Sequence, residues 1–78
     1  MHSKEMLRFI AESLVDQTDK VQINEVQGER ALVLELQVAD EDMGKVIGRN
    51  GRVIQAIRTV SKAAAIRDGK KIHVEVVD

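Results

Sequence analysis

The sequence predicts an α+β domain, a two-layer sandwich in which three helices cover one face of a three-stranded mixed sheet. Three segments carry apolar residues at helical spacing, and three others alternate apolar and polar residues. Along the chain these segments follow the order α-β-β-α-α-β. A long helical crossover separates the second and third strands, which allows them to lie parallel. The 78 residues fit one domain, which we expect to span residues 1–78.

The first predicted helix begins near Ser3, because serine is a preferred N-cap residue. Its apolar residues recur three and four positions apart: Met6, Leu7, Ile10, Leu14 and Val15. Polar residues break this pattern at 16–19, where we expect the helix to end.

A β-hairpin is predicted next. Residues 20–24 alternate polar and apolar side chains, Val26 follows, and Gly28 marks a turn. Residues 31–38 predict the second strand, with four apolar side chains on one face: Leu32, Leu34, Leu36 and Val38.

The second half predicts two helices and a strand. Asp40 is expected to cap a short helix, with Glu41 and Asp42 in its first turn, that continues through Met43 to Ile47, since aspartate favours N-caps. A longer helix follows Gly51, and Gly69 is its expected C-cap. Its predicted buried stripe comprises Val53, Ile57, Val60 and Ala64, with Ile54 and Ala56 beside it. Residues 72–76 alternate as the last strand.

The net charge of −1 conceals a strong segregation of charge. Residues 1–42 contain four Lys or Arg and ten Asp or Glu, whereas residues 43–78 contain eight basic and three acidic residues. A basic half of this kind is compatible with nucleic-acid binding, although basic residues that only solvate a helix remain an alternative.

The segment between the two predicted helices, Gly48-Arg49-Asn50-Gly51, carries the strongest functional signal. Its two glycines permit a tight turn and the close approach of a ligand backbone. The turn delivers main-chain N–H groups to the start of the next helix, where an anion is favoured. Three cations flank it, Lys45, Arg49 and Arg52, and three aliphatic residues adjoin it, Val46, Ile47 and Ile54. A phosphate on one side and a base on the other would suit such a surface. A helix–helix turn without a ligand is the alternative interpretation.

The stretch Val46-Ile47-Gly48-Arg49-Asn50-Gly51-Arg52-Val53-Ile54 resembles the signature V-I-G-x-x-G-x-x-I of the KH family. The element order resembles the type II KH arrangement, and the likeness extends over nearly the whole chain, most closely to small bacterial single-KH proteins of the KhpA type. The resemblance implies binding of single-stranded RNA, with residues 48–51 clamping the backbone of about four nucleotides. It also implies a role of RNA-chaperone type in post-transcriptional regulation. Lys45, Arg52, Val46, Ile47 and Ile54 are the other expected RNA-binding residues.

Two further hypotheses remain open. Arg58, Lys62 and Arg67 recur along the third helix and either face solvent or touch RNA. The chain also fits an interaction subunit that pairs with itself or with a larger KH-containing protein, since a single weak module gains avidity from a second copy.

Catalysis is not expected. The chain has no cysteine, and the sequence places no plausible catalytic partner beside either of its two histidines, His2 and His73. The acidic residues lack metal-ligand spacing, so we expect no metal and no cofactor. No apolar run approaches the ~20 residues of a membrane span, and no targeting sequence is recognised. We therefore expect a cytoplasmic protein.

Overall fold

The chain folds in the order that its hydrophobic pattern predicts. A computed structural model describes residues 3–77. The elements are α1 (Ser3–Leu14), β1 (Gln22–Gln27), β2 (Leu32–Gln37), α2 (Met43–Ile47), α3 (Arg52–Arg67) and β3 (Ile72–Val76). Three single turns of 3₁₀ helix, Thr18–Lys20, Asp40–Asp42 and Arg49–Gly51, join them. The α+β fold class is therefore confirmed.

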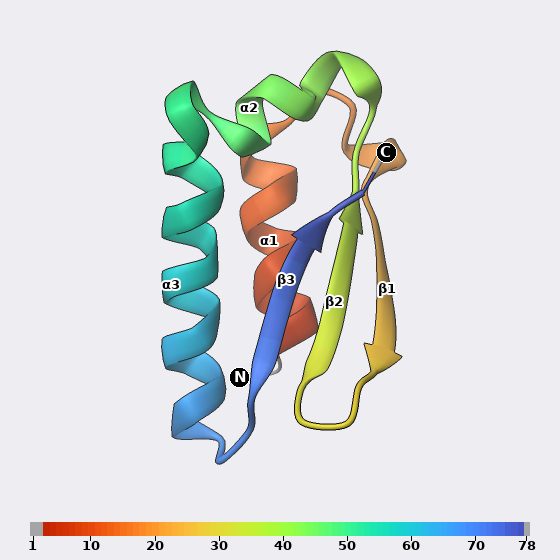
Figure 1. Cartoon of the computed structure of the whole chain (residues 1–78). Helices are drawn as coiled ribbons and strands as arrows, with labels where there is room; N and C mark the ends of the chain where they lie inside the picture. Colours follow the sequence, from red (N-terminus) through yellow and green to blue (C-terminus); the bar gives the residue numbers. More distant parts are fainter. Residues whose placement is uncertain (1–2, 78) are drawn as a thin grey trace.

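The three strands form one mixed sheet in the order β1-β2-β3. β1 and β2 are antiparallel and pair Ile23 with Leu36, whereas β2 and β3 are parallel and pair Leu34 with Val74. Gly28 donates its N–H to Ala31 O at 2.9 Å and closes the hairpin between β1 and β2. The two long helices pack on one side of the sheet, and α2 crosses the end of this helical layer (Figure 1). The sheet thus has two edge strands, β1 and β3.

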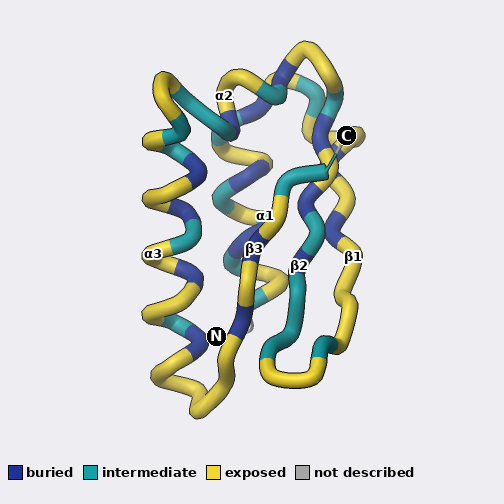
Figure 2. The backbone as a smooth tube through the Cα atoms, viewed as in Figure 1, coloured by how far each residue is buried: buried dark blue, intermediate teal, exposed yellow. Residues whose placement is uncertain are grey.

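The core lies between the helices and the sheet, where the buried segments of both layers face each other (Figure 2). Leu7 and Ala11 of α1 are fully buried, as are Leu34 and Leu36 of β2. Truncating a buried leucine to alanine typically costs about 2–5 kcal/mol, so these side chains dominate the stability of a domain this small.

The buried face of α3 differs from the predicted stripe. Its buried residues are Ile54, Ile57, Ser61 and Ala65, whereas Val60 is 50% exposed. The prediction that Val60 belongs to the core is therefore wrong. The helix is rotated so that the small side chain of Ser61 lies between α3 and the sheet. Hydrophobic periodicity predicted burial of Val60 and not of Ser61, because valine is the more apolar residue, and so did not predict this rotation of α3.

The prediction that Asp40 caps the second helix is also wrong. Asp40 begins a 3₁₀ turn, and among the described residues no side chain caps that turn or α2. The structural carboxylate is that of Asp42, which is 1% exposed. Its Oδ2 accepts the main-chain N–H of Gln17 at 3.0 Å, so it joins α2 to the segment after α1.

The end of α3 follows the prediction. Gly69 has a positive φ of 69° and donates its N–H to Ile66 O, while Lys70 donates to Ala65 O at 2.8 Å. This pair of hydrogen bonds is a Schellman motif, in which glycine takes the left-handed position without strain. Over residues 3–77, no helix has both the length and the apolar character that crossing a bilayer would require.

Candidate nucleic-acid interface

The loop between α2 and α3 is built from left-handed backbone. Gly48 has φ 76° and ψ 172°, a conformation essentially restricted to glycine. Asn50 (φ 57°) and Gly51 (φ 73°) both lie in the left-handed helical region, which asparagine tolerates better than most residues. The sequence Gly-Arg-Asn-Gly therefore fits the backbone angles of this loop at three of its four positions.

Close packing adds a second constraint at Gly48. A Cβ atom built on this residue would lie 2.3 Å from Cγ2 of Val53 and 2.9 Å from the Val53 nitrogen. At Gly51 the nearest atom would be Cγ2 of Ile54, at 3.9 Å. Gly48 thus lets the loop fold back onto the first turn of α3, whereas Gly51 is required only for its backbone angles.

The main chain of the loop presents free donors. Gly48 and Gly51 use their N–H groups on Gly44 O and Gly48 O, at 2.9 and 3.1 Å. Within residues 3–77, the N–H groups of Arg49 and Asn50 have no main-chain partner. Unpaired donors at a helix start attract anions. The loop therefore offers the donors that a phosphate group would accept.

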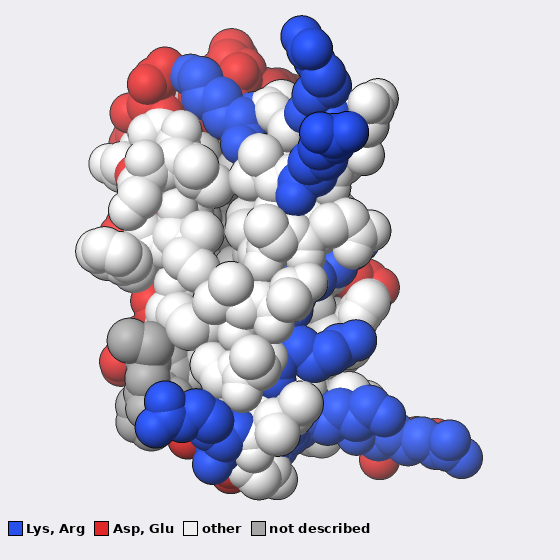
Figure 3. Space-filling view, turned by 90° about the vertical axis from the view of Figure 1, so that its left-hand side faces the viewer, with Lys and Arg blue, Asp and Glu red and all other residues white. Residues whose placement is uncertain are grey.

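Arg49 and Arg52 are exposed and make no ion pair with any residue in the described part of the chain. Viewed from the side of α3, basic side chains gather towards the upper and lower ends, acidic ones lie mostly along one edge, and uncharged surface separates the two basic ends (Figure 3). The loop between α2 and α3 lies at the upper end (Figure 1). Unpaired guanidinium groups at this end suit bidentate contacts with phosphate.

Lys45, unlike Arg49 and Arg52, makes ion pairs within the molecule. Its Nζ pairs with the carboxylate of Asp16 and lies 3.1 Å from Oδ1 of Asp42. Hydrogen bonding to Asp16 and then to Asp42 raises the pKa of Lys45, and the hydrogen bond from Gln17 N–H, with a smaller contribution from Lys45, lowers the pKa of Asp42. Lys45 is therefore engaged in an internal ion pair, although its side chain is still 44% exposed, and its contact with RNA stays a prediction.

The three aliphatic residues around the loop occupy different depths. Val46 is fully buried and Ile54 is 7% exposed, whereas Ile47 is partly buried and packs against the core. A base laid beside the loop would thus touch Ile47, while Val46 and Ile54 support the surface from below. The sequence pattern predicted all three as groove residues, because it does not show how deeply each side chain is buried.

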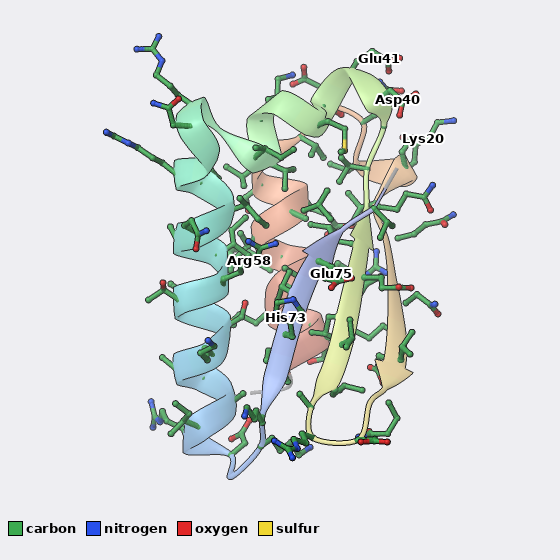
Figure 4. The ribbon with its side chains drawn as sticks, viewed as in Figure 1. Lys20, Asp40, Glu41, Arg58, His73 and Glu75 are labelled. Atoms are coloured by element: carbon green, nitrogen blue, oxygen red, sulfur yellow. The ribbon has the colours of Figure 1, made fainter. Side chains whose placement is uncertain are left out.

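A groove lies between α3 and β3, and two of its polar residues, Arg58 and Lys62, were already candidates from the sequence. Arg58 donates from Nε to the main-chain oxygen of Val74 at 3.0 Å. Figure 4 shows Arg58 reaching from α3 towards β3, with His73 and Glu75 on the strand. His73 Nε2 lies 3.4 Å from Glu75 Oε1, and both side chains are about half exposed. The alternation of residues 72–76 places both side chains on one face of the strand, which from sequence alone is most simply explained as polar patterning of a solvent-facing surface.

Other chemistry is not assembled in the described residues. No group of three or more His, Cys, Asp or Glu side chains in residues 3–77 lies close enough to hold a metal ion. His2 lies outside these residues.

Comparison with known proteins gives consistent results. A family model described as the KH domain of KhpA and KhpB matches residues 4–76. The chain is 57% identical over 74 residues to a protein of Clostridium acetobutylicum named RNA-binding protein KhpA, covering 95% of this chain and 99% of that protein. A protein of the same name from Borreliella burgdorferi is 43% identical over 74 residues, covering 95% of this chain and 90% of its own length.

The fold also occurs within a larger solved structure. The chain superimposes on part of Era from Aquifex aeolicus with a TM-score of 0.65, at 17% identity. The match covers 95% of this chain and 29% of that one. At this level of identity the likeness concerns the fold alone.

Proposed function

This chain belongs to the KhpA/KhpB family of KH domains, and we propose that it binds single-stranded RNA through the loop Gly48–Gly51. The family is one of RNA-binding domains and not of enzymes. The observation that carries the proposal is the loop itself, where glycines with positive φ meet two N–H groups and two arginines that have no partner within residues 3–77. About four nucleotides would bind per domain.

In this proposal the loop holds the RNA backbone and the adjoining groove holds bases. The N–H groups of Arg49 and Asn50 donate to phosphate oxygens, and the guanidinium groups of Arg49 and Arg52 add charge-assisted contacts. Ile47 offers aliphatic surface to one base. Lys45, Val46 and Ile54 act indirectly, because they hold α2 and the first turn of α3 in place. We further infer a cytoplasmic, RNA-chaperone-like role in post-transcriptional regulation.

Replacement of Arg49 and Asn50 by aspartate tests the proposal. Fluorescence anisotropy with short unstructured RNAs, at two salt concentrations, should show binding by the wild type and none by Arg49→Asp/Asn50→Asp. Both residues are exposed, so the variant should keep its fold by circular dichroism.

A matched control carries the same charge change at the other end of the molecule. Gln27→Asp/Arg30→Asp alters the exposed hairpin end, which lies at the opposite pole from the loop (Figure 1). This control should retain binding. Equal loss in both variants would show that net charge, and not the loop, governs association, and unchanged binding in the loop variant would reject the proposal.

A second proposal concerns a protein partner. Three large apolar side chains stand exposed on the long helices: Phe9 at 72% on α1, and Val60 at 50% and Ile66 at 69% on α3. Exposed apolar surface of this kind suits pairing with a second copy or with another KH-containing chain. Sedimentation equilibrium should show a dimer that Val60→Glu converts to a monomer, and a monomeric wild type at all concentrations would exclude self-pairing.

A further inference from the structure

β3 is an edge strand, and its free edge is turned towards α3. In a parallel ladder, successive residues point their main-chain groups to opposite sides. Lys71 O and Val77 N–H both bond to β2, so the odd-numbered residues pair with that strand. The even-numbered residues therefore direct N–H and C=O outwards, and these are Ile72, Val74 and Val76.

Arg58 takes up one of these outward groups. Its Nε donates to Val74 O at 3.0 Å, and the side chain is partly buried. Guanidinium carries five N–H donors and no acceptor. For the Nη groups of Arg58, residues 3–77 supply no hydrogen-bond acceptor or carboxylate partner. The Val74 N–H likewise has no partner among these residues. Beside Arg58, the edge therefore offers the Val74 N–H and the Nη groups as donors, while the Val74 carbonyl is already occupied by Arg58 Nε.

A hollow of about 260 Å³ opens at this edge. Ile66 and Ile72 contribute apolar walls, and Arg58 and Val74 lie along its side. Ser61, which also lines it, is fully buried and its Oγ lacks a hydrogen-bond partner in the described residues. Pockets for drug-sized ligands occupy about 300–1,000 Å³, so this hollow suits a single flat base.

We propose that Arg58 determines base specificity: by covering the Val74 carbonyl, it leaves only donors at the Val74 position of the strand edge and so selects guanine over adenine. This inference rests on the proposed RNA-binding function and assigns a residue to its specificity. The base concerned is the one that lies against β3.

The chemistry of base edges supports this selection. Guanine presents two neighbouring acceptors, O6 and N7, and arginine contacts both of them in the commonest specific pairing. Adenine has its N6 amino donor beside the N7 acceptor, so it can accept only one of two adjacent donors from the protein. Without Arg58, the edge would offer the Val74 N–H donor next to the Val74 carbonyl acceptor. That pattern matches adenine and disfavours the two acceptors of guanine.

The position of Arg58 fits a strand held at the loop. Arg58 lies six residues after Arg52, the first residue of α3, which corresponds to about 9 Å along the helix at 1.5 Å per residue. Four nucleotides span at least about 10 Å at 3.4 Å per nucleotide, so a strand clamped by the loop reaches this edge.

Binding of uridine hexamers that carry one guanine or one adenine at each position in turn tests the assignment. The wild type should prefer guanine at one position by about tenfold, the scale of a good bidentate base contact. Arg58→Met removes the guanidinium while keeping an unbranched side chain, and should bring this ratio to one or reverse it. Arg58→Lys keeps the charge but not the planar donor group, and should also lose the preference.

The outcomes separate the two proposals. Equal weakening of guanine and adenine in Arg58→Met, with Arg58→Lys restored to wild type, would overturn the assignment, because Arg58 would then act as charge alone. An unchanged ratio in folded Arg58→Met would overturn it as well. If the wild type binds no hexamer and Arg49→Asp/Asn50→Asp changes nothing, the RNA-binding proposal itself fails. Loss of all binding in Arg49→Asp/Asn50→Asp, with the guanine preference lost only in the Arg58 variants, supports both.

Discussion

The two ends of α2 are built in opposite ways. Its N-terminal end is tied down by side chains, since the buried Asp42 accepts from Gln17 N–H and pairs with Lys45, which also reaches Asp16. Its C-terminal end leads into residues 48–51, where the N–H groups of Arg49 and Asn50 have no main-chain partner within residues 3–77. Five residues separate this fixed anchor from the loop. The comparison indicates that ordered ion pairs position the loop, while the loop itself offers the main-chain donors and arginines that the proposed RNA contact requires.

The largest effect is expected for Gly48→Ala. Left-handed strain costs about 1–3 kcal/mol, and overlap with Val53 adds a cost of overpacking of similar size. We expect a loss of about 2–6 kcal/mol in unfolding free energy, measured by urea denaturation, together with loss of RNA binding. Gly51→Ala meets no close atom and should cost about 1–2 kcal/mol. Equal costs at the two glycines would contradict the packing argument.

The loop could be predicted from sequence because its signals are local. Glycine at positions 48 and 51 and helical periodicity on either side suffice to predict a turn between helices, and the resemblance to KH domains then assigns it a ligand. The ion pair between Lys45 and Asp16 could not be predicted in this way. Its partners lie 29 residues apart, so only the packing of α1 against α2 brings them together.

The exposure of Val60 and the burial of Ser61 were unpredictable for a related reason. Both residues continue a helical stripe with Ile57, one at three-residue and the other at four-residue spacing. The orientation of α3 against the sheet decides between them, and small side chains permit the closer approach. The role of Arg58 on the β3 edge depends on the same orientation.

The next effect in size concerns the anchor. Asp42→Asn removes the charge from a buried group that accepts from Gln17 and Lys45, so the melting temperature should fall at neutral pH. The pKa of Asp42 is lowered in the folded state. Its stabilising contribution is therefore complete above the ordinary carboxyl pKa of roughly 3.9 and is lost as the pH falls through the folded-state pKa. The melting temperatures of wild type and variant should converge in strong acid. A constant difference at all pH values would show that ionisation of Asp42 is not the cause.

A smaller effect is expected on the salt dependence of RNA binding, which should distinguish Arg49 and Arg52 from the ion-paired Lys45. Arg49→Ala/Arg52→Ala removes two unpaired guanidinium groups, so the slope of log affinity against log salt should fall by about 1.4, at 0.7 per phosphate contact on a single strand. The melting temperature should not change. Lys45→Ala should lower the melting temperature and leave the slope as in the wild type, because Lys45 is committed to Asp16 and Asp42. A reduced slope in Lys45→Ala would instead place this lysine on the phosphate backbone.

The smallest effect is expected for Gly44→Ala, at the anchored end of α2. Gly44 lies inside the helix, its φ is not positive, and an added Cβ would meet no atom within 4 Å. Alanine exceeds glycine in helix propensity by about 0.5–1 kcal/mol and also restricts the unfolded chain. The variant should therefore gain about this amount in urea denaturation and keep its RNA affinity. Since Gly44 and Gly48 stand four residues apart in one short segment, opposite signs for the same substitution would show that the requirement for glycine begins only where the helix opens into the loop. A loss of RNA affinity in a stabilised Gly44→Ala variant would mean that the anchored end also touches the ligand, and the division between the two ends of α2 would no longer hold.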